Sequence, residues 1–142
     1  MAKIIIYTNE ETGGVSLCIP SGEVPIDEVQ RHTPHGSRIV ESDSLPHTHY
    51  DFLNAWVLQD GEVTIDMRKA LAIRQDQLRD ERASILASLD VQFMKALEVG
   101  DLKAQAAIAT KKQALRDCTQ DPAILNATTP DELKAARPAA LS

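Results

Sequence analysis

Four histidines have a spacing that could bind a metal ion. His32 and His35 are three residues apart, and His47 and His49 are separated by one residue. Imidazoles are common ligands of Zn²⁺ and related divalent ions. Both pairs lie beside prolines in predicted loops, and no pair of cysteines supports them. We therefore expect solvated loop histidines, predict neither a bound metal nor a cofactor, and retain these four residues as weak candidates for a metal site.

The two cysteines, Cys18 and Cys118, are candidate nucleophiles. A catalytic thiol needs an electropositive, partly exposed setting beside a base. Cys18 lies in a predicted strand within an acidic half of the chain, which opposes thiolate formation. We expect two buried structural thiols. A disulfide between them would require the first predicted hairpin to touch the second long helix, and the sequence leaves that open.

Other catalytic patterns are missing from the sequence. Glu10 and Glu11 are adjacent, as are Asp27 and Glu28, so neither pair predicts two carboxyl groups converging in a cleft. No glycine-rich phosphate loop, Ser-His-Asp arrangement or metalloprotease motif is present. We predict that the protein is not an enzyme.

Charge divides the chain into two parts. Residues 1–66 contain eleven acidic and three basic residues, whereas residues 67–142 contain ten acidic and twelve basic residues. We therefore predict two domains, 1–66 and 67–142. The net charge of −6 argues against a general nucleic-acid-binding protein, which needs a basic face. No apolar run approaches the ~20 residues of a membrane span, and no signal peptide is expected at the start.

The first part has the pattern of short strands. Residues 3–8 and 15–19 predict an N-terminal hairpin, residues after Pro25 a short helix, and residues 38–41 a third strand. Asp60-Gly61 lies between two alternating runs and predicts a two-residue hairpin turn. The aromatic residues Phe52 and Trp56 are expected in the core. Together these signals predict a small antiparallel β-rich head.

The second part has a helical pattern. Asp66 can cap a helix of about 32 residues that ends at Gly100-Asp101, and a second helix follows over residues 102–119. Because the link between these two helices is short, we predict that they form an antiparallel αα-hairpin. Asp121-Pro122 and Thr129-Pro130 predict short C-terminal helices, and the last residues, from Arg137 on, are expected to fray. The predicted fold class is α+β.

One face of the long helix is the main candidate for partner binding. A helix of about 48 Å is longer than a small domain and must pack against another segment or another subunit. Two interpretations are balanced: the face binds a partner or a second copy, or the second helix and the β-rich part cover it. The face consists of Leu71, Leu78, Arg82, Ile85, Leu89 and Phe93, followed by Ala96.

Several segments match a known family. They are 4–8, 14–20, 45–46, 52–56 and the 60–61 turn, and most strongly 79–82, 89–98, 112–117 and 129–133. Through these segments, which span most of its length, the chain resembles a family of small bacteriophage proteins encoded near tail-fibre genes, described as tail-fibre assembly or tail accessory proteins. The chain departs from the family at Leu53, because members often have a basic residue at this position of the Phe-x-Asn-Ala-Trp segment.

The resemblance implies a non-enzymatic phage tail accessory protein that binds a tail-fibre or baseplate protein. The favoured role is a tail-fibre assembly chaperone acting in the host cytoplasm during assembly. One alternative is a permanent structural component of the tail fibre or baseplate, located in the virion tail. Another is a phage protein that binds a host protein. Self-association through the long helix is a further expectation, whereas nucleic-acid and membrane partners are not expected.

Overall fold

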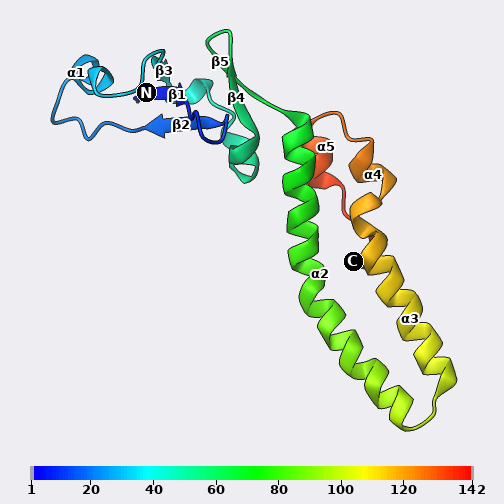
Figure 1. Ribbon diagram of the computed structural model, residues 1–142. Coiled ribbons are helices and arrows are strands. Elements are labelled where there is room, and N and C mark those ends of the chain that lie inside the picture. Colours follow the sequence, from blue (N-terminus) through cyan, green and yellow to red (C-terminus); the bar gives the residue numbers. More distant parts are fainter. Residues whose placement is uncertain (1, 142) are drawn as a thin grey trace. The chain divides into compact units, whose positions relative to one another are not determined.

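A computed structural model describes residues 2–141 and has an α+β fold, as the sequence predicts (Figure 1). The chain forms two compact units, Met1–Ala70 and Leu71–Ser142. Helix α2 begins in the last residues of the first unit and supplies the longest element of the second. Among residues 2–141, no helix is both long enough and apolar enough to cross a membrane.

A three-stranded antiparallel sheet organises the first unit. Its strands are β1 (Lys3–Thr8), β2 (Val15–Cys18) and β3 (Arg38–Glu41), in the order β2-β1-β3. Helix α1 (Ile26–Arg31) contacts β1, the central strand. The predicted N-terminal hairpin, short helix and third strand are all confirmed.

A separate hairpin follows, formed by β4 (Trp56–Gln59) and β5 (Glu62–Ile65). Asp60 and Gly61 connect the strands with φ angles of 52° and 83°. Both residues are therefore left-handed, as a tight two-residue turn requires. The segment His47–Ala55, whose two histidines were expected in a loop, instead forms 3₁₀ turns that lead into β4.

Apolar side chains from both sheets form the core of the first unit. Ile4, Ile6, Leu45 and Trp56 are buried together. Phe52 is also buried, at 1% exposure, so the expectation that Phe52 and Trp56 are core residues is confirmed. The half-buried residues that pack around this core are Val15, Leu17, Val40, Leu58, Val63 and Ile65.

Two long helices form the second unit, α2 (Met67–Glu98) and α3 (Leu102–Asp117). The Asp66 carboxylate accepts a hydrogen bond from the backbone N–H of Arg68 at 2.9 Å, which caps α2. Gly100, with φ of 71°, follows the end of α2. Asp101 then caps α3 by accepting from the N–H of Ala104 at 3.0 Å.

Cross-helix contacts show that α2 and α3 run antiparallel (Figure 1). Near the turn, the Gln105 amide donates to the carbonyl oxygen of Ala96 at 3.4 Å. Further along, Lys112 pairs with Asp90, and Arg82 donates to the carbonyl oxygen of Arg116 at 2.8 Å. Because residues later in α3 meet residues earlier in α2, the predicted αα-hairpin is confirmed.

Short C-terminal helices complete the second unit: α4 (Pro122–Leu125), α5 (Pro130–Ala135) and a 3₁₀ turn at Ala139–Leu141. Leu133 and Leu141 are buried. The prediction that the chain frays from Arg137 is wrong for the described residues, because burial of Leu141 and a hydrogen bond from Arg137 to the Leu141 carbonyl oxygen anchor this end. Ser142 lies outside the described residues.

Candidate functional site

The predicted binding face of α2 is directed largely into its own hairpin. Leu78 is 0% exposed and Leu89 is 7% exposed. Ile85 is the most accessible member of the set, at 38%. The remaining three, Leu71, Arg82 and Phe93, are half-buried. Partner contact through these six residues remains a prediction, and for Leu78 it would require the hairpin to open.

Arg82 and Phe93 contribute to the contact between the helices. The Arg82 guanidinium donates to the carbonyl oxygens of Leu115 and Arg116, at 3.1 and 2.8 Å. The last carbonyls of a helix lack an N–H partner one turn further along the helix. The Leu115 oxygen also accepts from the backbone N–H of Cys118, and the arginine gives both oxygens a side-chain donor. The Lys112 ammonium lies 5.7 Å from the centre of the Phe93 ring, within the range of a cation–π contact.

An apolar hollow of about 330 Å³ opens beside Ile85, and we call it the hairpin groove. It brings two residues of the predicted binding face, Ile85 and Leu89, together with residues of α3 and of the C-terminal turn. Its lining residues are Ile85, Leu89, Lys111, Ala114, Leu115 and Ala140.

The chemistry of the hairpin groove is that of a binding site. Aliphatic side chains make up its lining except for the ammonium group of Lys111. The lining contains no carboxylate, imidazole or thiol that could act as a base or nucleophile. The groove can accommodate an apolar side chain, and Lys111 favours an acidic residue next to it.

The C-terminal turn that supplies Ala140 is held by an arginine. Arg137 lies 3.0 Å from a carboxylate oxygen of Glu81 on α2 and also donates to the carbonyl oxygen of Leu141 at 3.1 Å. Sequence reasoning missed Lys111, Ala114 and Ala140 as groove residues. No local signal in the sequence indicates where Ala140 packs.

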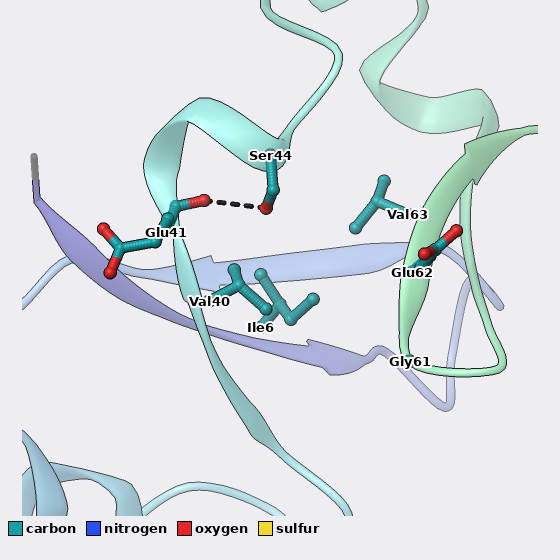
Figure 2. A pocket seen from close by; sticks show the side chains of 7 residues that line it. All are labelled: Ile6, Val40, Glu41, Ser44, Gly61, Glu62 and Val63. Atoms are coloured by element: carbon teal, nitrogen blue, oxygen red, sulfur yellow. Dashed lines mark hydrogen bonds between the residues drawn. The ribbon is translucent and has the colours of Figure 1, made fainter.

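A second hollow, of about 480 Å³, lies within the first unit (Figure 2). Ile6, Val40 and Val63 form its apolar part, and the Ser44 hydroxyl donates to the carbonyl oxygen of Glu41 at 2.7 Å. Figure 2 shows the Glu41 carboxylate directed away from Val40 and Ile6. The hollow therefore lacks a converging pair of carboxyl groups, although Glu62 also lines it.

The four histidines lie in the first unit. His32 and His35 are exposed in the turns between α1 and β3. His47 is exposed, with its Nδ1 3.1 Å from the Tyr50 hydroxyl, and His49 is half-buried in the same 3₁₀ segment. Among residues 2–141, no group of three or more His, Cys, Asp and Glu side chains is arranged to hold a metal ion.

The two cysteines are free thiols. Cys118 is buried at 3% exposure in the second unit, which fits a structural residue. Cys18 is half-buried in β2, so the expectation of full burial is wrong for this side chain. Cys18 is the last residue of β2 and lies opposite Ile5 of β1.

Comparisons with protein-family models, with curated proteins and with solved structures find no match to this chain.

Proposed function

We propose that this chain is a non-enzymatic accessory protein of a bacteriophage tail, and more specifically a chaperone for tail-fibre assembly. Its partner is a tail-fibre or baseplate protein. The family resemblance motivates the biological setting, and the hairpin groove is the observation that supports a binding role. An open apolar groove with one lysine at its edge is suited to a protein segment rather than to a reaction.

The groove defines the chemistry expected of the partner. Ile85 is 38% exposed at the groove and can bury its remaining surface against an aliphatic or aromatic side chain. Lys111 is exposed on α3, and its ammonium group would pair with a carboxylate next to that side chain. The proposed ligand is therefore an apolar segment of the fibre protein that carries an acidic residue.

The first experiment tests binding. A tagged chain is co-expressed with the tail-fibre proteins of the phage that encodes it, and captured proteins are quantified. We expect Ile85→Asp to abolish capture, because the substitution places a carboxylate in an apolar groove. Val91→Asp is the matched control, since Val91 is 56% exposed on the same helix but does not line the groove. Equal capture by wild type and Ile85→Asp would reject the groove as the docking site.

The second experiment tests the chaperone role. Quantitative mass spectrometry of purified particles and infected-cell lysate should find the protein abundant in the lysate and missing from particles. A fixed ratio to tail proteins in particles would replace the chaperone assignment with that of a structural virion component. Capture of a host protein without tail proteins would reject the tail-accessory proposal itself.

A further inference from the structure

Another hollow of the second unit adjoins the hairpin groove. It has a volume of about 400 Å³ and lies at the end of α3, and we call it the distal hollow. Ala114 of α3 and Ala140 of the C-terminal turn line both the hairpin groove and the distal hollow. The two hollows therefore meet across these two side chains.

The boundary between the two hollows is low. Alanine carries only a methyl group, and Ala114 is exposed while Ala140 is half-buried. Small side chains at a contact allow another segment to approach closely. A protein segment that enters the hairpin groove can therefore continue across the two alanines into the distal hollow.

The distal hollow contains two carboxylates. Asp117 accepts a hydrogen bond from the Gln113 amide at 3.0 Å, and Asp121 accepts one from the backbone N–H of Ala123 at 2.9 Å. Both donors are uncharged, and within residues 2–141 neither carboxylate forms an ion pair. The guanidinium group of Arg82, near the end of α3, instead binds main-chain carbonyl oxygens. Both carboxylates are therefore available to a cation from outside the chain.

The hairpin groove has the opposite charge at its edge. Lys111 lines it and is exposed, and no ion pair engages this ammonium group in the described part of the chain. Asp117 lies six positions further along α3, which corresponds to about 9 Å along the helix axis. The aliphatic side chains of Ile85 and Leu89 also line the hairpin groove. The joined groove thus has a basic end, an apolar wall and an acidic end.

We propose that the two hollows form one binding groove for a protein segment that carries an acidic residue at one end and a basic residue at the other. This inference rests on the proposed function and specifies its ligand further. The acidic side chain pairs with Lys111, and apolar side chains pack against Ile85 and Leu89. A lysine or arginine of the segment pairs with Asp117 and Asp121.

The groove also determines the spacing and the direction of the segment. An extended chain rises by about 3.3 Å per residue, so its acidic and basic residues are at least about three positions apart. A segment lying in the reverse direction would bring its base to Lys111 and its acid to Asp117. Like charges would then meet at both ends, which disfavours this direction.

Removal of the acidic charges tests the distal hollow. The chain and the tail-fibre protein that it captures are purified, and their dissociation constant is measured for Asp117→Asn combined with Asp121→Asn. Asparagine keeps an acceptor oxygen for Gln113 and caps a helix as aspartate does, so the fold is preserved. We expect the dissociation constant to rise about fivefold and its dependence on salt to weaken. Asp80→Asn with Glu98→Gln is the matched control, since it removes two exposed charges of α2 outside both hollows.

Removal of the basic charge tests the other end. Lys111→Gln should also raise the dissociation constant about fivefold, whereas Lys103→Gln, at an exposed position of α3 outside both hollows, should leave it unchanged. An unchanged constant for Lys111→Gln would reject the assigned direction of the segment.

Cross-linking tests the position of the basic residue. Gln120 lines the distal hollow and is exposed, so Gln120→p-benzoylphenylalanine should cross-link to a peptide of the tail-fibre protein that contains lysine or arginine. Asn126→p-benzoylphenylalanine is the control, because Asn126 is exposed outside the distal hollow and should give no cross-link.

The outcomes separate this inference from the proposed function. If wild type binds no tail-fibre protein, or if Ile85→Asp binds as tightly as wild type, the proposed function fails and this inference fails with it. If Ile85→Asp abolishes binding but the double asparagine variant binds like wild type, only the distal hollow is rejected. A cross-linked peptide without a basic residue would likewise reject the distal hollow and leave the hairpin groove as the docking site.

Discussion

Arginines on α2 bind main-chain carbonyl oxygens as well as carboxylates. Arg74 is only 8% exposed and donates to the carbonyl oxygen of Ala136, at 3.1 Å, which ties the end of α5 to α2. Arg82 likewise ties the end of α3 to α2, by donating to the carbonyl oxygens of Leu115 and Arg116. Charged residues on a helix usually form a solvated surface, but these two cations contribute to packing. The distinction depends on contacts with residues 33 to 62 positions away, which no local pattern encodes.

The structure perturbs the protonation of Glu132, whose pKa is lowered. The backbone N–H of Thr128 at 2.8 Å is the main cause, and with the Thr128 hydroxyl it lowers the pKa of Glu132 below its ordinary value. A lowered pKa means that folding favours the ionised form. Its stabilisation is therefore present above about pH 4.3 and is lost as the pH falls through the lower folded value.

We expect Glu132→Gln to reduce the acid sensitivity of the second unit. Urea midpoints followed by circular dichroism should fall less between pH 7 and pH 3 in the variant than in wild type, because the amide does not titrate. Glu98→Gln, at the exposed end of α2, is the control and should follow wild type. Identical pH profiles for all three proteins would show that the Thr128 hydrogen bonds do not contribute to stability.

At the scale of elements, the turn between α2 and α3 depends on one backbone conformation. Gly100 has φ of 71°, and a Cβ there would meet no atom within 4 Å. Any cost of adding a side chain thus comes from the backbone rather than from a clash. We expect Gly100→Ala to lower the unfolding free energy by about 1–2 kcal/mol.

Gly100→Asn is the matched comparison, since asparagine tolerates the left-handed region better than alanine. It should cost less than Gly100→Ala in the same urea titration. Equal costs for the two variants would mean that something other than the positive φ governs the turn.

Most elements were predictable because their signals are local. Asp60-Gly61 specifies a turn that joins two alternating runs, and Asp66, Gly100 and Asp101 mark helix ends. The 3₁₀ turns at 47–55 were missed, because Pro46 and the polar residues that follow it indicate only irregular structure. The hairpin groove was missed in part, because Ala140 reaches it through the burial of Leu141, a tertiary effect.

At the scale of the whole molecule, the two compact units give different spectroscopic signals. Trp56, the single tryptophan, is fully buried in the first unit. The long helices that dominate the far-UV circular dichroism belong mostly to the second. Separate observation of each unit is therefore possible in the full chain.

We expect Leu78→Ala to destabilise the second unit by about 2–5 kcal/mol, because it leaves a cavity at a side chain with 0% exposure. The helical signal at 222 nm should melt earlier, whereas the Trp56 fluorescence transition should stay at its wild-type temperature. Phe52→Ala is the reciprocal variant and should shift the fluorescence transition. Coincident shifts of both signals in Leu78→Ala would indicate one cooperative domain rather than two.

The location of Trp56 in the first unit has a practical consequence for anyone purifying this protein. Both tyrosines, Tyr7 and Tyr50, lie in the same unit as the tryptophan. The second unit contains a single aromatic residue of this kind, Phe93, which does not absorb at 280 nm. Absorbance at 280 nm therefore detects only the first unit. If a protease separates the units, the released helical hairpin will elute unseen on a column monitored at that wavelength. Detection at 214 nm, where the peptide bond absorbs, is needed to follow the part of the molecule that we propose binds its partners.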